Sequence, residues 1–420
     1  MSIKHQLLTG LLGILLFTLP TAFAQGTSNT STARPADPLE SKLNAVLGSF
    51  TDSKALPGVV AGLANAKETL YQGASGWRNI ASAEPMQQDT IIAIASMTKP
   101  VTTVAVLQLV DRGLLDLDLP ASHYLPQLAA LQLLAGFDAN GNPRLTKPPR
   151  IPTTRELLSH TSGYAYEFWN ENIHRAVDNG LVTSLFVPGQ AGLQAPLAFA
   201  PGARWDYGIG IDWAGRLVEK LSGKPLDRYF HDHIFTPLQM HDTFYFVPED
   251  KQARLASAYV ETDNGFEVSP PLVPEVSGGG GLYSTVADYL RFMRALLNQG
   301  RLEGAQILTS ASVEAMFENQ IGDIPVTPLA TQVPAASNDF DMGFGAPAHW
   351  GLGFLLHQTG TASGRPAGTA SWAGLFNSYF WIDRKNGICA IVATQVLPFY
   401  DADAVKLLKS YEAAIYGEIQ

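Results

Sequence analysis

The sequence predicts an α+β fold in which one antiparallel sheet is flanked by helices and carries a mainly helical insertion. Two β-rich runs lie near each end of the chain, at residues 58–65 and 69–76 and at residues 378–382 and 388–396. A short polar segment separates the two runs of each pair, which is the pattern of a β-hairpin. The region from about 117 to 290 has apolar residues at helical spacing instead. Strands at both ends of a chain, with helices between them, indicate one shared sheet.

The first 24 residues have the features of a cleavable signal peptide. Lys4 precedes an apolar run over residues 7–19, and Ala24 provides a small residue at the expected cleavage site. The run is shorter than the ~20 residues of a membrane-spanning helix, so we expect no span after processing. We therefore expect a periplasmic or secreted protein, with an uncleaved N-terminal anchor as the alternative. Residues 25–36 are rich in Ser, Thr, Pro and Ala and predict a flexible leader before a domain at 37–420.

Amphipathic spacing predicts helices along this domain. Apolar residues recur every three or four positions, so that one face of each helix can pack on the core. The predicted helices cover residues 38–50, 101–115, 153–159, 211–221, 285–298 and 402–416. Pro100 lies at the start of the second of them, where the fixed φ of proline is tolerated. A further strand is predicted over residues 351–357.

Composition excludes several classes of function. The chain has a formal net charge of −10 and no basic cluster that could displace counterions from phosphates, so we expect no nucleic-acid partner. Cys389, the single cysteine, lies in an apolar run and is interpreted as a buried thiol. No group of His, Cys, Asp and Glu has metal-ligand spacing, so neither a metal nor another cofactor is implied. The expected partner is a small molecule, and the oligomeric state stays open.

Ser96 and Lys99 are the first candidates for chemistry. Residues three positions apart share one face of a helix, so the lysine amine can reach the serine hydroxyl. A serine hydroxyl becomes a good nucleophile when a base takes its proton, and a desolvated lysine can help to do so. The alternative is structural, with Ser96 as a helix cap and Lys99 as a surface charge. Ser-x-x-Lys occurs only once in the sequence, and no Gly-x-Ser-x-Gly motif competes with it.

Three motifs together resemble the serine β-lactamase-related family. They are Ser-Met-Thr-Lys-Pro at 96–100, Leu-Leu-Ser-His-Thr-Ser-Gly at 157–163 and Gly-Gly-Gly-Gly-Leu-Tyr-Ser-Thr at 278–285. The family includes class C β-lactamases, D-alanyl-D-alanine carboxypeptidases, family VIII carboxylesterases and fungal acyltransferases. The resemblance covers nearly all of the mature chain and implies the β-lactamase/transpeptidase-like fold. Its motifs are typical of the family rather than of one substrate.

The resemblance gives Tyr207 the role of a proton shuttle. The family has a catalytic tyrosine in a Tyr-x-Asn motif, and the Pro-Gly at 201–202 matches the residues that precede it. With Lys99, Tyr207 would deprotonate Ser96, protonate the leaving group and activate water. The alternative is an ordinary packed aromatic residue. Ile209 replaces the asparagine that holds a substrate carbonyl in β-lactamases, and this replacement argues against β-lactam recognition.

A second departure from the β-lactamases lies near the C-terminus. Where they have Lys-Thr-Gly, this chain has Trp372-Ala373-Gly374, which is similar to the Trp-x-Gly of family VIII esterases. The missing lysine removes a positive charge for a substrate carboxylate. The resemblance implies that Trp372 and Gly374 bind substrate, and that the backbone N–H groups of Ser96 and Leu375 form the oxyanion hole. Alternatively, Trp372 only packs within its strand.

These residues predict a serine hydrolase that forms an acyl-enzyme on Ser96, with a carboxylesterase as the best fit. The alternatives are a β-lactamase, a D-amino-acid peptidase, an acyltransferase of the same family, or a non-catalytic penicillin-recognising protein. The expected substrate is a small ester or amide. His160 is interpreted as part of a structural turn, and residues 278–281 as flexible backbone beside the site. Aromatic candidates for an apolar acyl pocket are Tyr166, Phe168, Trp169, Phe199, Trp205, Phe344, Trp350, Phe376 and Phe399.

Overall fold

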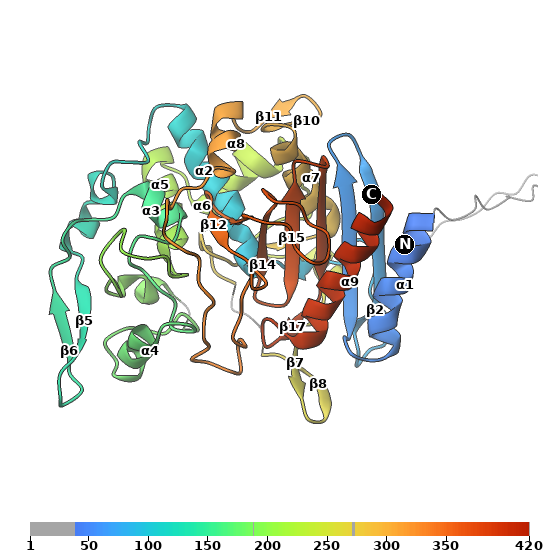
Figure 1. Ribbon diagram of the computed structural model, residues 1–420, viewed down its shortest axis with the longest axis horizontal. Helices are drawn as coiled ribbons and strands as arrows, with labels where there is room; N and C mark the ends of the chain where they lie inside the picture. The colour runs from blue at the N-terminus through green and yellow to red at the C-terminus, as the bar shows by residue number, and fades with distance from the viewer. Residues whose placement is uncertain (1–37, 188, 271–273, 420) are drawn as a thin grey trace, which may run out of the picture. The chain divides into compact units, whose positions relative to one another are not determined.

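An eight-stranded antiparallel sheet is the central feature of the structure (Figure 1). The computed structural model describes residues 38–187, 189–270 and 274–419. Strands from the two ends of the chain meet where β1 pairs with β16, which confirms the predicted shared sheet. The strand order is β12 (Ala348–Trp350), β13 (Leu355–His357), β14 (Ala370–Gly374), β15 (Ser378–Asp383), β16 (Ile388–Ala393), β1 (Gly58–Asn65), β2 (Thr69–Asn79) and β3 (Glu84–Pro85).

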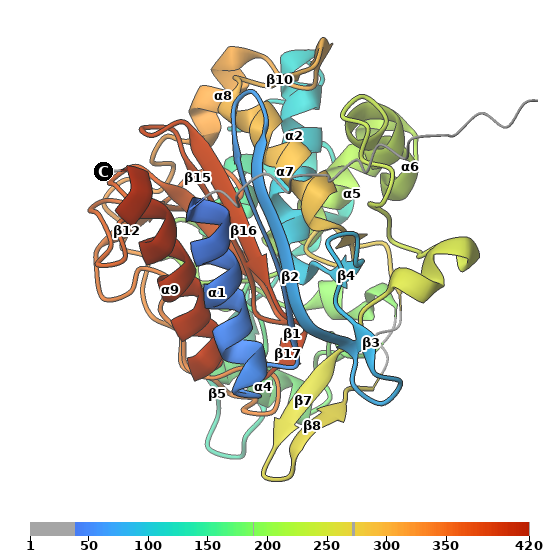
Figure 2. The same ribbon diagram turned by 90° about the vertical axis from the view of Figure 1, so that its right-hand side faces the viewer.

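Helices cover both faces of this sheet. α1 (Pro38–Asp52) and α9 (Ala402–Ile419) lie side by side on one face, while α7 (Val286–Leu297) packs against β1 and β16 on the other (Figure 2). All residues of β15 and β16 are therefore buried. A strand covered on both faces has no solvent-facing side, which explains the continuous apolar run of β16. Cys389 lies in this strand as a free, fully buried thiol, as predicted.

The helical part is centred on α2 (Thr98–Asp111), which begins two residues after Ser96. α2 packs against α5 (Gly210–Ser222), and α5 contacts α3 (Thr154–Leu158). The other helices are α4 (Glu171–Asp178), α6 (Leu226–Phe230) and α8 (Ser310–Met316). The predicted helices are all present. The helix after Ser96 is shorter than predicted, since it ends at Asp111 and not at residue 115. Gly113 follows its end with a left-handed φ of 68°, which is common just after a helix.

Side chains fix where two of these helices start. Thr153 accepts a hydrogen bond from the Glu156 N–H, and the Glu156 carboxylate accepts one from the Thr153 N–H, which is a capping box for α3. Thr285 caps α7 by accepting from the Asp288 N–H. Because both caps stand beside segments that enter the site, they set the positions of those segments.

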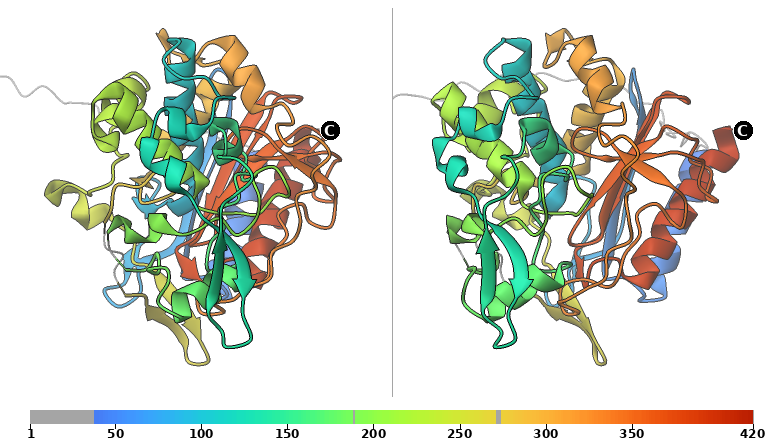
Figure 3. Two further views of the ribbon diagram at one scale, coloured as in Figure 1. Left: turned by 90° about the vertical axis from the view of Figure 1, so that its left-hand side faces the viewer. Right: turned by 60° about the vertical axis from the view of Figure 1, so that its left-hand side comes forward.

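The structure also contains short strand pairs that the periodicity does not indicate. They are β4 (Ile92–Ala93) with β9 (Tyr283–Ser284), β5 (Leu133–Phe137) with β6 (Pro143–Thr146), β10 (Arg301–Leu302) with β11 (Ala305–Gln306), and β7 (Tyr259–Thr262) with β8 (Gly265–Val268) and β17 (Val396–Leu397). The β5–β6 pair extends from the helical part as a hairpin (Figure 3). It has little buried surface, so its sequence lacks the apolar alternation of a core strand.

The strand predicted over residues 351–357 is wrong in its first half. A turn occupies this half, and it separates β12 from β13. Gly353 adopts a φ of 88° in this turn, a conformation that a regular strand does not contain.

Two expectations about the N-terminus lie outside the described residues, namely the signal peptide at 1–24 and the leader at 25–36. In the ranges that the structure does describe, no helix is both long and apolar enough to cross a membrane.

Candidate active site

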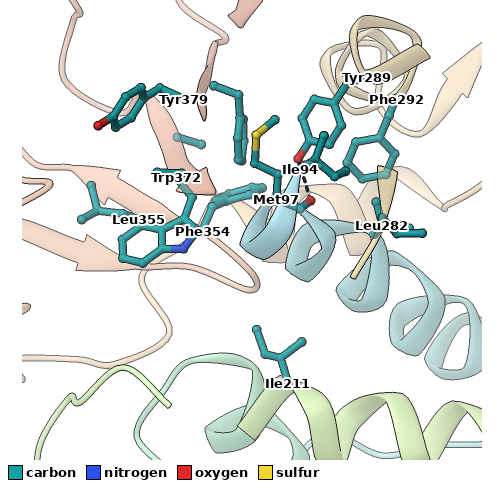
Figure 4. Close-up of a cluster of buried hydrophobic side chains, with 14 of the residues drawn as sticks. Ile94, Met97, Ile211, Leu282, Tyr289, Phe292, Phe354, Leu355, Trp372 and Tyr379 are labelled. Carbon is teal, nitrogen blue, oxygen red and sulfur yellow. Dashed lines mark hydrogen bonds between the residues drawn. The ribbon is translucent and has the colours of Figure 1, made fainter. Parts of the chain in front are cut away.

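A tight turn presents Ser96 between the sheet and the helical part. β4 pairs with β9, the chain turns through Ala95 with a φ of 43°, and a single 3₁₀ turn (Ala95–Met97) leads into α2. Met97 points into the core, and its carbonyl accepts a hydrogen bond of 2.9 Å from the Tyr289 hydroxyl (Figure 4). Ser96 is thus held from both sides at the beginning of a helix, whose dipole favours negative charge nearby.

Lys99 lies one turn further along α2 and is fully buried. Its Nζ donates to the Ser96 Oγ at 3.1 Å, to the Tyr166 hydroxyl at 3.1 Å and to the Gly279 carbonyl at 2.7 Å. These contacts account for the three protons of an ammonium group. None of the carboxylates described in the structure forms an ion pair with Lys99. The structure therefore joins the two residues of the Ser-x-x-Lys motif by a direct hydrogen bond.

Tyr207 lies on the other side of Lys99, with its ring centroid 4.7 Å from the Nζ. Its hydroxyl accepts a hydrogen bond of 3.0 Å from the Trp372 indole N–H. The Tyr207 side chain is buried and is among the residues that line the cavity beside Ser96. The structure thus places the Tyr207 ring next to Lys99, and the role of proton shuttle stays a prediction.

Tyr166 is a second tyrosine beside Lys99, which the sequence indicated only as a pocket aromatic. Its hydroxyl accepts from Lys99 and donates to the Asp212 Oδ2 at 3.3 Å. The other oxygen of Asp212 accepts from the Ser277 hydroxyl and from the Gly279 N–H. Burial and the Asp212 carboxylate raise the pKa of Tyr166 well above its ordinary value. Tyr166 is therefore held in its protonated form.

The glycine-rich segment lies against Lys99 and Asp212. The Gly278 carbonyl accepts a 2.6 Å hydrogen bond from the Thr102 hydroxyl, and the Gly279 carbonyl accepts from Lys99. A Cβ atom at Gly279 would lie 2.3 Å from an oxygen of Asp212. Glycine is needed here because the backbone and the carboxylate approach each other so closely. The segment thus orients the Lys99 side chain through the Gly279 carbonyl.

The end of β14 supplies the backbone of the predicted oxyanion hole. Ser96 and Leu375 both line the cavity, and within the described residues neither backbone N–H has a hydrogen-bond acceptor. Gly374 does not line the cavity. A Cβ atom there would lie 2.4 Å from the Ile94 carbonyl, so this glycine allows β14 to approach the turn before Ser96. The position of Gly374 therefore favours a role in placing the two N–H groups. Direct contact of Gly374 with substrate stays a prediction.

Replacing Gly374 by alanine should therefore lower activity more than the loss of stability explains. The added Cβ must push β14 away from the Ser96 turn, and we expect about tenfold or greater loss in kcat with about 1–3 kcal/mol of destabilisation. Gly48→Ala is the matched control, because a Cβ at this α1 position meets nothing closer than 3.7 Å. Urea unfolding and ester hydrolysis test both variants. Full kcat in Gly374→Ala would contradict the role assigned to this glycine.

Trp372 is buried behind Tyr207 and is not among the residues that line the cavity. Its ring packs against Trp350, with centroids 4.5 Å apart, and its one polar atom donates to Tyr207. The role of Trp372 in substrate binding stays a prediction, and the contact that the structure shows is the one with Tyr207. Ile209 is also buried outside the cavity lining, at the N-cap position of α5.

His160 has a structural position in the turn after α3. Its φ of 57° belongs to a turn, and its Nδ1 accepts a 3.3 Å hydrogen bond from the Gly208 N–H. Its ring packs against Tyr207 with a centroid separation of 4.7 Å. Full burial and the nearby Lys99 charge lower the pKa of His160 well below its ordinary value, so the imidazole is neutral. His160 thus packs against the Tyr207 ring as a neutral side chain.

A cavity of about 270 Å³ opens beside Ser96. Four of the predicted aromatic residues line it, namely Tyr166, Phe168, Trp169 and Phe376. The other five, which are Phe199, Trp205, Phe344, Trp350 and Phe399, lie elsewhere in the fold. Phe186 and Tyr283 line the cavity without having been predicted, because nothing in their local sequence distinguishes them. The cavity is thus mainly aromatic and aliphatic, and its lining also contains the charged residues Asp212, Arg216 and Glu275.

A half-buried serine bonded to a buried lysine, two adjacent tyrosines and free backbone N–H groups beside an apolar cavity define a serine enzyme of the acyl-transfer type. The family model described as Beta-lactamase matches residues 43–412. This chain therefore belongs to the Beta-lactamase family, whose relatives include esterases and acyltransferases.

Several relatives match most of the chain, two of which are described below. Lovastatin esterase of Penicillium rubens is 34% identical over 371 residues, which cover 81% of this chain and 88% of that protein. Monacolin J acid methylbutanoyltransferase of Aspergillus terreus is 30% identical over 401 residues, which cover 88% of this chain and 93% of that protein. Among solved structures, simvastatin synthase (LovD) from Aspergillus terreus has a TM-score of 0.80 at 28% identity and covers 92% of this chain and 100% of its own.

Proposed function

We propose that this chain is a carboxylesterase that forms an acyl-enzyme on Ser96. The observation that carries the proposal is the fully buried Lys99, whose Nζ lies 3.1 Å from the Ser96 Oγ at the wall of an apolar cavity. The similarity to lovastatin esterase supports an ester as the substrate. A binding protein would need neither the buried amine nor the tyrosine beside it.

In the acylation step, the Ser96 Oγ attacks the ester carbonyl carbon, and its proton passes to Tyr207, which starts the step as a phenolate stabilised by the Lys99 ammonium group. The carbonyl oxygen becomes an oxyanion, which the N–H groups of Ser96 and Leu375 stabilise. The carbon–oxygen bond to the alcohol then breaks, and Tyr207 returns the proton to the departing alkoxide. The product is a free alcohol, and the acyl group remains on Ser96.

In the second step, water attacks the acyl-enzyme and gives its proton to Tyr207. The bond to Ser96 breaks, the serine regains the proton, and the carboxylic acid leaves. An alcohol in place of water would give a new ester by the same route. The similarity to monacolin J acid methylbutanoyltransferase favours such acyl transfer as the second candidate activity.

The cavity favours esters with an apolar acyl group. Its volume of about 270 Å³ corresponds to roughly nine water molecules at ~30 Å³ each. A chain of a few to about ten carbons would fit this volume. β-Lactams should be poor substrates, because Ile209 and Trp372 occupy the two motif positions at which β-lactamases have an amide and a cation.

A panel of p-nitrophenyl esters, run beside the β-lactam nitrocefin, tests this proposal. Wild type should hydrolyse short to medium acyl chains and leave nitrocefin nearly untouched, while Ser96→Ala should lose ester turnover. A fluorophosphonate probe should label wild type and not the variant, since labelling needs an activated serine. Strong nitrocefin cleavage with negligible ester turnover would make the chain a β-lactamase instead. Addition of a small alcohol to the ester assay tests transfer, because a new ester would appear.

We also propose that the chain is exported through its first 24 residues. The proposal rests on the charged start, the apolar run and Ala24. Sequencing the N-terminus of exported protein should find it just after Ala24. An N-terminus at Met1 would contradict cleavage.

A further inference from the structure

Two tyrosines stand beside Lys99, and their hydroxyl groups differ in one partner: Tyr166 has the Asp212 carboxylate as an acceptor, whereas Tyr207 has the Trp372 N–H as a donor. The Tyr207 oxygen accepts a hydrogen bond from the Trp372 N–H, and an indole nitrogen can only donate. The Tyr166 hydroxyl donates to the Asp212 carboxylate, which only accepts when ionised. A donor stabilises a deprotonated oxygen, whereas an acceptor retains a proton. The two rings lie 5.1 Å apart, so both tyrosines are close enough to compete for one role.

We propose that Trp372 and Asp212 are positioning residues that decide which tyrosine beside Lys99 loses its proton. Trp372 stabilises the deprotonated form of Tyr207, and Asp212 keeps Tyr166 protonated. Tyr207 can then accept the Ser96 proton, while Tyr166 serves as a fixed hydrogen-bond acceptor for Lys99. The inference rests on the proposed acyl-enzyme mechanism and assigns these two residues a role that neither motif implies.

The hydrogen bonds of Asp212 fix which of its oxygens faces Tyr166. Oδ1 accepts from the Ser277 hydroxyl and the Gly279 N–H, so only Oδ2 is available to Tyr166. In Asp212→Asn the amide oxygen must therefore occupy the Oδ1 position, where two donors need it. The amide N–H₂ then points at the Tyr166 oxygen, and the acceptor at that position becomes a donor. The substitution reverses the selection while keeping the shape of the side chain.

The neighbouring charge of Lys99 acts differently on the two tyrosines. Its Nζ donates to the Tyr166 hydroxyl at 3.1 Å, whereas it lies 4.7 Å from the centroid of the Tyr207 ring, so Lys99 alone favours loss of the Tyr166 proton. His160 packs on Tyr207 from the turn after α3, and burial keeps it uncharged. Asp212 acts on Tyr166 both by charge and by hydrogen bond, and both effects raise the pKa of that hydroxyl. Trp372 and Asp212 thus both oppose the preference that Lys99 alone would give to Tyr166.

The test for Trp372 is the dependence of kcat/KM on pH for p-nitrophenyl butyrate, with product measured after quenching at each pH. Trp372→Phe keeps the ring and removes the N–H. We expect the acidic limb to move upward by about one pH unit, with about tenfold lower kcat/KM at neutral pH. Trp381→Phe is the matched control, since Trp381 is a buried strand tryptophan that also donates to a tyrosine, Tyr416 of α9, at 3.1 Å. Its profile should keep the wild-type midpoint.

The test for Asp212 is a double-mutant cycle with Tyr166→Phe. Asp212→Asn alone should lower kcat/KM by about tenfold or more, and in the Tyr166→Phe background by less than about twofold. Asp288→Asn controls for replacing a buried aspartate, because Asp288 accepts from Thr243 and from the Asp242 N–H away from the tyrosines. A merely structural Asp212, acting through Gly279, would cost the same in both backgrounds.

The outcomes separate this inference from the proposed function. An unshifted profile in Trp372→Phe, an equal shift in both tryptophan variants, or an additive Asp212 cycle would each overturn the inference. In those cases wild type would still react with the fluorophosphonate probe. Failure of the probe to label wild-type Ser96 would instead overturn the proposed function.

Discussion

Replacing Lys99 by methionine should reduce kcat/KM for ester hydrolysis by about 10³-fold, the middle of the range for loss of a group that takes part in general acid–base catalysis. Methionine keeps most of the apolar stem but removes the donor to Ser96, Tyr166 and Gly279. The serine then lacks the cation that holds its oxygen and assists proton removal. Steady-state hydrolysis of a p-nitrophenyl ester measures the loss.

The same change should destabilise the fold only moderately. The Gly279 carbonyl loses a buried donor, which costs about 1–3 kcal/mol. Lys251→Met is the control. Like Lys99, Lys251 donates to a backbone carbonyl, but it also pairs with a carboxylate, is partly exposed and is not among the residues that line the cavity. We expect the control to keep wild-type kcat. Activity of Lys99→Met within tenfold of wild type would remove Lys99 from the mechanism.

Tyr207→Phe should lower kcat by about 10²–10⁴-fold, because the ring stays packed while the group that carries the proton is lost. The ring contacts with His160, Tyr166 and Trp372 are all retained in this variant. Rapid-quench measurement of alcohol and acid release shows whether acylation, deacylation or both become slow. If Tyr207 serves both steps, both rates fall.

Tyr416→Phe provides the comparison for Tyr207→Phe. The Tyr416 hydroxyl also accepts from a strand tryptophan, and it donates to the Asp383 carboxylate on the α9 side of the sheet. Its loss should affect stability alone. Were Tyr166→Phe to abolish turnover while Tyr207→Phe remained active, the roles of the two tyrosines would be exchanged.

The parts of the site that depend on local sequence could be predicted. Ser96 and Lys99 are three residues apart on one helix, so their hydrogen bond follows from helical geometry. The strands β15 and β16 and the turn between them are likewise specified by adjacent residues. The shared sheet followed from strands at both ends of the chain.

The surroundings of Lys99 depend on residues that are distant in sequence. Tyr166 meets Asp212 across 46 positions, and Trp372 meets Tyr207 across 165. A buried tyrosine next to a donor has the same local sequence as one next to an acceptor, so no periodicity or spacing reveals the difference. For the same reason, the sequence indicated Trp372 as a substrate contact, whereas its N–H is used by Tyr207.

Close backbone approach is a second feature that local sequence leaves open. Gly374 allows β14 to pass against the Ile94 carbonyl, and Gly279 allows the glycine-rich segment to lie on Asp212. Both glycines lie in the recognised motifs, but the motifs do not show which atom each glycine lies against. Only the packed structure identifies which atom occupies the space of the missing side chain.

The central claim is that Ser96 carries the acyl group, and the mass of the intact protein tests it most directly. Wild type mixed with p-nitrophenyl butyrate and quenched in acid within the first turnovers should gain the mass of one butyryl group, which peptide mapping should place on Ser96. Ser96→Ala should gain none. An unmodified wild-type protein that still turns over the ester, or an acyl group on Ser96→Ala, would contradict the account.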